Sequence, residues 1–312
     1  MFPVSFPLHR VFPGLTQDVA IAIASYLDIN ALVDVRATSH AGDQLLAAEI
    51  THRSRRLLGP LLTDYEGFVK ELHITGSIIA GQSALHILYP SHPRPPIIVI
   101  SAPKASFFHI LSYLVHCERF TPAFSTPRPT LAGTWVDLTR SGHQIRLVRS
   151  PSPSALEPIM THWHTALFGY LRPGEFCVPY ASLTTHRRAL VNGRRLGEQG
   201  QVPDSIRNLR EAWRADGWRI RLFPPSTSRA RCTGVASAHC AAARRHFGDA
   251  HCLSGPTQSL VHRTAPALRY DAIAEWAVMW WRGGQVCNKA CHAGAGEVAP
   301  GHRACLYIVM RK

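Results

Sequence analysis

The chain has 312 residues, which allows two domains and a small third module at about 100–200 residues per domain, and its 46% hydrophobic content excludes wholesale disorder. Charged residues make up 17% of the chain, and 34 Lys and Arg against 20 Asp and Glu give a net charge of +14. The positive charge comes from 30 arginines and 4 lysines spread along the sequence. We attribute this spread to a GC-rich genome rather than to a dedicated phosphate-binding surface.

The sequence carries no recognisable signal for export or membrane insertion. Residues 1–15 lack a basic segment followed by a long apolar core, so we expect no secretory signal. No run of about 18 or more apolar residues occurs, so we expect no transmembrane helix. Eight cysteines are too few for a disulfide framework in a chain of this length. We therefore expect an intracellular protein of the cytoplasm or nucleus with mostly reduced thiols.

The first sixty residues have helical periodicity. Apolar residues recur at every fourth position, which predicts one helical stripe made of Leu15, Val19, Ile23 and Leu27. Residues 28–30 interrupt this pattern, and a short second helix follows. Ser39 is a suitable cap for a third helix, which we expect to end at Gly59 and Pro60.

Residues 12–50 combine a proline near the start, a Tyr-Leu pair at the end of the first helix and a Leu-rich second helix. In this order they resemble an F-box. The resemblance implies that the helices bind a Skp-type adaptor of a cullin ubiquitin ligase through apolar side chains. The side chains expected at this contact are Pro13, Leu15, Ile23, Leu27 and Leu32. Phe12 and Gly14-Leu15 depart from the family pattern, and the alternative interpretation is a three-helix packing element without a partner.

The following region, over residues 61–228, has alternating patterns of strands and helices. A turn of small residues enters an apolar helix within residues 76–89, and the continuous apolar run 97–100 predicts a buried strand. The other predicted elements are a helix over 106–117, a hairpin over 134–149 around Ser141-Gly142, a helical segment over 159–171, a helix from Asp204 to Gly217, and a strand over 218–223.

Three stretches of this region, over residues 74–90, 145–171 and 176–192, carry a second resemblance. Together with the F-box-like start, they resemble a group of basidiomycete fungal proteins of unassigned function that contain a nucleotidyltransferase-like domain. The resemblance implies a Gly-Ser turn that cradles phosphate and metal-binding carboxylates on the next strand. The candidate phosphate-binding residues are Gly76, Ser77, Gly81 and Ser83.

The carboxylates of that pattern are missing from this sequence. The strand predicted at 97–100 contains no Asp or Glu, and the later strand has Arg146 where an acid is expected. Asp137 is the only carboxylate near this position in the sequence. Because one carboxylate cannot hold two Mg²⁺ ions, we expect no catalytic residues, no cofactor and no enzymatic activity.

The C-terminal region, over residues 229–312, is rich in Cys and His. It contains no Cys-x2-Cys pair, so its spacing matches no zinc finger and we expect no metal site; structural zinc is the alternative. One helix is predicted over 271–281, with Ile273, Trp276 and Trp280 on one side. The rest of this region has little periodicity and predicts no regular element.

The sequence thus predicts an α+β, or mixed α/β, protein in three parts. These are an F-box-like helical module (1–60), a degenerate nucleotidyltransferase-like domain (61–228) and a Cys/His-rich region of uncertain order (229–312). The expected function is recruitment of an unknown target protein to a cullin ubiquitin ligase, without catalysis. The alternative is a nucleotide- or nucleic-acid-binding protein, for which the basic clusters Arg187-Arg188 and Arg194-Arg195 are candidates.

Overall fold

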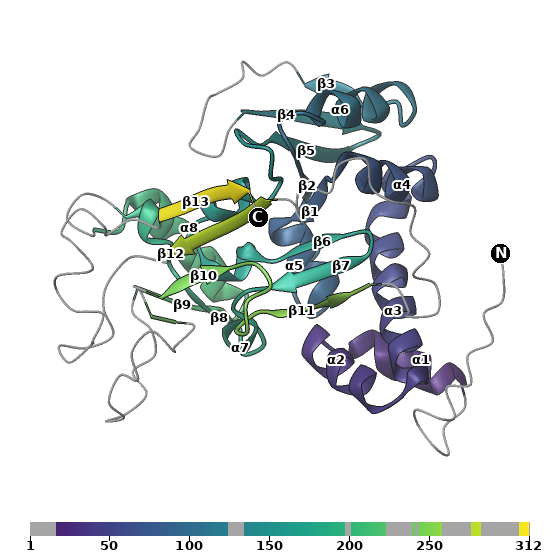
Figure 1. Ribbon diagram of the computed structural model, residues 1–312, viewed down its shortest axis with the longest axis horizontal. Coiled ribbons are helices and arrows are strands. Elements are labelled where there is room, and N and C mark those ends of the chain that lie inside the picture. Colours follow the sequence, from purple (N-terminus) through teal and green to yellow (C-terminus); the bar gives the residue numbers. More distant parts are fainter. Residues whose placement is uncertain are drawn as a thin grey trace.

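The computed structural model describes residues 17–123, 134–196, 201–222, 239–240, 243–257, 276–281 and 306–311. Helices and strands are mixed along the chain, which confirms the predicted fold class at the level of a mixed α+β protein (Figure 1). The N-terminal helices, drawn in purple, lie at one end of the molecule beside strand β11 (Figure 1).

Helices occupy the chain before the first strand. They are α1 (Gln17–Tyr26), α2 (Ile29–Thr38), α3 (His40–Leu58), the short 3-10 helix η2 (Gly59–Leu61) and α4 (Tyr65–Thr75). The predicted cap is confirmed, because the Ser39 hydroxyl accepts a hydrogen bond of 3.0 Å from the backbone N–H of Gly42 at the start of α3. Asp28 caps α2 in the same way, with the Ala31 N–H at 3.0 Å. α1 and α2 pack on α3, and α3 packs on α5.

The main sheet has eight strands in the order β11-β7-β6-β1-β2-β5-β4-β3. Their bounds are β1 Ile78–Ala80, β2 Ile97–Ala102, β3 Thr121–Ala123, β4 Thr134–Arg140, β5 His143–Arg149, β6 Tyr170–Arg172, β7 Glu175–Val178 and β11 Leu253–Pro256. β1 is antiparallel to both neighbours, β2 and β6, whereas β2 and β5 are parallel. Helix α5 (Gly81–Leu88) joins β1 to β2, and α6 (Phe107–His116) follows β2.

The predicted hairpin is confirmed as β4 and β5. Its two turn residues, Ser141 and Gly142, have φ angles of 48° and 79°. Positive φ at both central residues is typical of a two-residue hairpin turn, because the twist of such a turn matches the twist of the two strands.

The remaining elements lie beside the main sheet. They are the 3-10 helices η3 (Glu157–Thr161), η4 (Thr165–Phe168) and η5 (Gly193–Arg195), the helices α7 (Ala181–Thr184) and α8 (Asp204–Ala215), and the strands β8 (Arg188–Leu190), β9 (Arg219–Arg221), β10 (Arg244–His246), β12 (Trp276–Trp281) and β13 (Leu306–Arg311). β8 pairs with β9, and β12 pairs with both β10 and β13. Over the described residues, α8 confirms the helix predicted from Asp204 to Gly217, and β9 confirms the strand predicted over 218–223.

Two predicted helices are wrong over the residues that the structure describes. Residues 276–281 form strand β12 rather than a helix, because a short apolar run fits either element and distant β10 and β13 supply its hydrogen-bonding partners. Residues 159–171 form η3, η4 and β6. The Asn192 side-chain amide donates to the carbonyls of Met160 and His162, at 2.8 and 2.7 Å, which removes both carbonyls from any continuing helix.

The centre of the main sheet is buried on both faces. Alternate residues of a strand point to opposite faces, and on β1 the side chain of Ile79 joins one hydrophobic cluster whereas Ile78 joins the other. The first cluster also contains Leu32 and Leu46 from the N-terminal helices. It therefore crosses the domain boundary predicted at residue 60, whereas the boundary predicted at residue 228 lies outside the described residues.

Candidate functional site

Helix α1 presents an uncovered apolar surface. Val19, Ile23 and Tyr26 are 45%, 38% and 87% exposed, and their i, i+4, i+7 spacing places them along one side of the helix. We call these three side chains the outer face of α1. Ala24, on the inner side, is fully buried. Three large apolar side chains in line on a helix surface are typical of a protein-binding site.

A buried arginine holds α1 with its outer face to solvent. Arg53 of α3 is 8% exposed and donates hydrogen bonds to the carbonyls of Ala24 and Leu27, at 2.8 and 2.6 Å. It also donates to the Glu49 carboxylate at 2.7 Å. Because helix-terminal carbonyls lack partners within their own helix, this guanidinium fixes the end of α1 against α3.

The structure separates the side chains predicted for adaptor binding. Ile23 lies on the outer face of α1, whereas Leu27 is half-buried against the core and Leu32 is fully buried. Pro13 and Leu15 lie outside the described residues. Tyr26 is the exposed residue that the prediction missed, although the Tyr-Leu pair that contains it was part of the F-box-like pattern.

The predicted phosphate cradle at Gly76 and Ser77 lies where α4 ends. Gly76 has a φ of 64° and its N–H donates to His73 O at 3.2 Å, while the Ser77 N–H donates to Leu72 O at 3.0 Å. The Ser77 hydroxyl accepts from Thr75 Oγ1 at 2.8 Å. These groups terminate the helix, and both N–H groups are already engaged.

The second part of the cradle, Gly81 and Ser83, forms the start of α5. Ser83 is fully buried, and its hydroxyl accepts from the Val99 N–H of β2 at 3.0 Å. Gly81 has a φ of 61°, and a Cβ atom there would lie 3.2 Å from the imidazole of His162. Desolvation lowers the pKa of His162 to about 4, so a neutral ring covers this helix start near neutral pH.

The acidic residues of the sheet do not form a metal site. Asp137 on β4 binds Arg146 on β5 through two hydrogen bonds, of 2.8 and 3.0 Å. Among the described residues, no group of three or more His, Cys, Asp or Glu side chains is arranged to hold a metal ion. Of the cysteines in the Cys/His-rich region, Cys232, Cys287, Cys291 and Cys305 lie outside the described residues.

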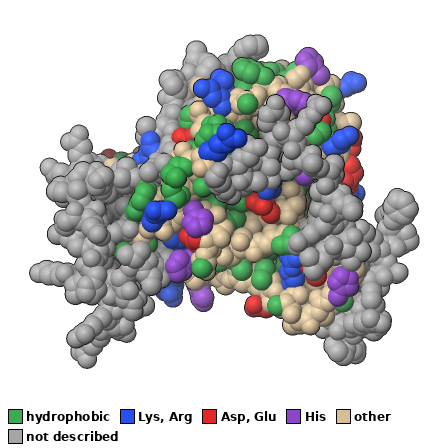
Figure 2. All heavy atoms as spheres, in the orientation of Figure 1, with side chains coloured by type: hydrophobic (Ala, Val, Ile, Leu, Met, Phe, Trp, Pro, Cys, Tyr) green, Lys and Arg blue, Asp and Glu red, His purple; other side chains and the backbone are tan. Residues whose placement is uncertain are grey.

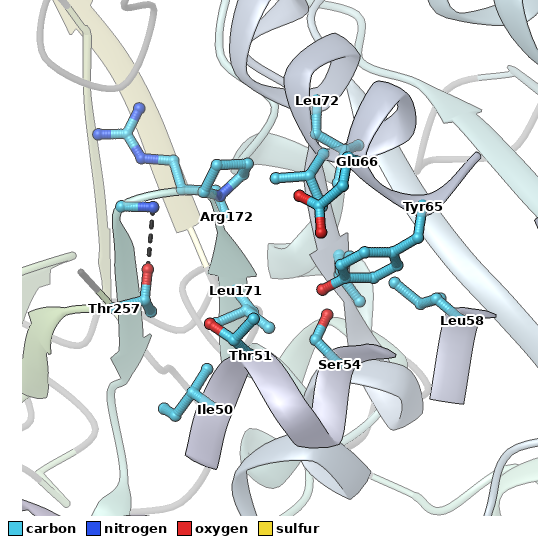
Figure 3. Close-up of a pocket in the computed structure, with 14 residues that line it drawn as sticks. Ile50, Thr51, Ser54, Leu58, Tyr65, Glu66, Leu72, Leu171, Arg172 and Thr257 are labelled. Atoms are coloured by element: carbon cyan, nitrogen blue, oxygen red, sulfur yellow. Dashed lines mark hydrogen bonds between the residues drawn. The ribbon is translucent and has the colours of Figure 1, made fainter. Parts of the chain in front are cut away.

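A pocket of about 230 Å³ lies between α3, α4, the β6–β7 turn and the residue after β11. Figure 3 shows Leu72 from α4, Leu171 from β6 and Ile50 from α3 around this space. Several of its polar side chains are engaged in hydrogen bonds or ion pairs. Glu66 pairs with Arg55, and Thr257 accepts from the Gly174 N–H at 2.9 Å. The pocket suits a small apolar group and brings together no set of catalytic side chains.

Arginines gather on the paired strands β8 and β9. Arg188 is the register partner of Arg219, and Arg221 lies two positions further on the same face. All three are exposed, and none forms an ion pair within the described residues. On the face shown in Figure 2, by contrast, Lys and Arg side chains are dispersed among apolar and acidic ones.

The arginine clusters predicted for phosphate binding serve mainly as structural anchors. Arg187 donates to the carbonyls of Asp216 and Ser91, at 2.9 and 3.0 Å. Arg195 donates to the Thr161 carbonyl at 2.7 Å. Only Arg188, of this predicted set, belongs to the exposed group on β8 and β9.

Comparisons with models of protein families, with curated proteins and with solved structures each find no match for this chain. Among the described residues, no helix is both long enough and apolar enough to cross a lipid bilayer.

Proposed function

We propose that this protein is an F-box-type adaptor, which binds a Skp-type adaptor of a cullin ubiquitin ligase through its N-terminal helices and recruits a target protein through the rest of the chain. The observation that carries the proposal is the outer face of α1, where Val19, Ile23 and Tyr26 are exposed in line along one side of the helix, whereas Ala24 is buried. An apolar helix face of this kind binds by inserting its side chains into a groove of the partner.

The packing of α1 on the rest of the protein supports this function. α1 rests on α3, which has 19 residues and packs on α5 beside the main sheet. A single hydrophobic cluster joins these helices to the sheet. In this proposal, a target bound elsewhere on the chain stays close to the adaptor bound at α1, which raises the effective concentration of the target near the ligase.

Charge substitutions on α1 test the proposal. We expect the double substitution Ile23→Glu and Tyr26→Glu to weaken binding of the full chain to a purified Skp-type adaptor by at least about 10-fold, because it places two charges in an apolar contact and the loss of a hot-spot residue near the centre of an interface costs about 2 kcal/mol or more. Biolayer interferometry measures this affinity, and circular dichroism checks that the variant is folded.

Ile21→Glu is the matched control. Ile21 is 43% exposed on the same helix but lies two positions from Val19, on the opposite side. We expect this variant to bind within about 3-fold of the natural protein, since only the outer face makes the contact. Equal binding by all variants, or no binding by the natural protein, would remove the basis of the proposal.

A second candidate function is binding of single-stranded RNA, and the exposed arginines of β8 and β9 favour it. Three phosphate contacts to Arg188, Arg219 and Arg221 predict an affinity loss of about 20-fold between about 50 and 200 mM salt. Fluorescence anisotropy with an oligonucleotide measures this loss. The triple Arg→Glu variant is expected to abolish binding, whereas Arg207→Glu, a charge reversal on α8, is expected to retain it. A salt-independent affinity would contradict this function.

A further inference from the structure

Two free thiols meet where the edge strand β11 joins the main sheet. Cys177 lies on β7 and is 1% exposed, and Cys252 directly precedes β11 and is half-exposed. They are 75 positions apart in the chain, yet the pairing of β11 with β7 sets Ser254 opposite Cys177, so that Cys252 lies two positions further along on the same side. The more accessible thiol therefore lies diagonally across the strand pair from the buried one.

A guanidinium lies beside the sulfur of Cys252. The Arg245 guanidinium lies 3.6 Å from Cys252 Sγ, and the Cys252 thiol donates to the His246 carbonyl at 3.5 Å. The interaction between the two thiols lowers the pKa of Cys252 and raises that of Cys177. A guanidinium beside a cysteine favours its thiolate form, which is the form that reacts with oxidants.

Hydrogen bonds to Asp249 hold the turn that carries Arg245. Arg245 is 1% exposed and binds the Asp249 carboxylate through Nη2 at 3.0 Å and through Nε. The same carboxylate accepts from the N–H groups of His246 and His251, at 3.2 and 3.0 Å. Asp249 is the negative group that faces Cys252, and its charge is offset by these bonds. Arg245 is thus held in place without depending on the thiolate.

We propose that Cys252 is a site of oxidation by hydrogen peroxide and that Cys177 resolves the product to a Cys177–Cys252 disulfide. The Cys252 thiolate attacks one oxygen of the peroxide, forming an S–O bond and breaking the O–O bond. Cys252 becomes a sulfenic acid, and the released hydroxide takes up a proton to form water. Cys177 then attacks this sulfur, the S–S bond forms, and hydroxide leaves with the Cys177 proton as a second water. Two thiols are oxidised and one peroxide is reduced.

The natural protein provides the first test. The full chain is treated with a small molar excess of hydrogen peroxide, alkylated and digested with trypsin, which places each thiol in a separate peptide, 150–187 and 246–263. Mass spectrometry is expected to find these peptides joined. Cys117 is exposed and serves as the internal reference. We expect Cys252 to lose alkylation at least about 10-fold faster than Cys117, because Cys252 has a nearby cation.

Cysteine variants separate the two roles. Cys177→Ser is expected to leave a sulfenic acid on Cys252 that dimedone labels, whereas Cys252→Ser is expected to leave Cys177 reduced. Cys240→Ser, at another buried cysteine, is the matched control and is expected to form the disulfide as the natural protein does. Oxidation of Cys117 while the peptides of Cys177 and Cys252 stay reduced would overturn the proposal. This result is measured on the natural protein, so it does not depend on the folding of any variant.

Discussion

Replacing Arg53 with methionine is expected to lower the free energy of unfolding by about 3–5 kcal/mol, because breaking a buried ion pair leaves an uncompensated charge. Glu49 is 4% exposed and loses its partner at 2.7 Å. The Leu27 carbonyl loses the arginine donor at the same time, and the Ala24 carbonyl keeps only the Leu27 N–H, at 3.1 Å. Urea unfolding followed by circular dichroism measures the difference.

The effect of Arg53→Met is specific to the buried site, and two further variants test this. Arg56→Met, at an exposed position of the same helix, is expected to change stability by less than about 0.5 kcal/mol. Adding Glu49→Leu to Arg53→Met is expected to recover part of the loss, since an apolar pair of similar volume replaces a buried ion pair well. If Arg53→Met and Arg56→Met were equally stable, the anchoring of α1 through Arg53 would be wrong.

Lowering the pH from 7 to 5 is expected to destabilise the protein by at least about 4 kcal/mol through buried histidines. Desolvation lowers the pKa of His92 and of His162 to about 4, and it lowers the pKa of His164 well below its usual value of 6.5. Below pH 6.5 the unfolded chain therefore binds protons that the folded protein does not. Each histidine then removes about 1.4 kcal/mol per pH unit until the pH reaches its folded pKa.

The surroundings of these histidines explain the low pKa values. His92 lies between Trp213 and Trp218, with ring centroids 5.0 and 5.8 Å away, and His164 lies 4.3 Å from Trp213. Within the described part of the chain, His92 Nδ1 and His164 Nε2 have no hydrogen-bond partner. A proton added to either ring is thus neither solvated nor paired.

Urea unfolding at the two pH values measures this dependence. His92→Phe is expected to reduce the difference between pH 7 and pH 5 by about 2 kcal/mol, because one titrating group is removed. His109→Asn, which changes an exposed histidine bound to Glu71, is expected to leave most of the difference intact. A stability that is constant between pH 5 and pH 7 would contradict the burial of these rings.

The elements that sequence patterns predicted well are those determined by local chemistry. The Ser39 cap, the Ser141-Gly142 turn and the end of α8 near Gly217 each depend on residues within a few positions of one another. By contrast, the error at β12 arises because Trp276–Trp281 is an apolar run whose strand partners, β10 and β13, lie 25 or more positions away.

The functional residues were predictable only in part, for the same reason. The spacing of Ile23 indicated an apolar helix stripe, but only packing shows that Leu32 faces the core. The Gly81 turn was recognisable, whereas the His162 ring that covers it comes from a segment 81 residues away in the sequence. No local signal pairs Cys177 with Cys252.

Hydrogen–deuterium exchange of the full chain with and without a Skp-type adaptor tests the central claim most directly. If the outer face of α1 is the docking surface, amides of residues 17–26 become protected in the complex, because binding suppresses local opening of this helix. Amides of β8 and β9 are expected to exchange at the same rate in both states. A complex in which α1 gains no protection, or in which protection appears at β8 and β9 instead, would contradict the proposed function.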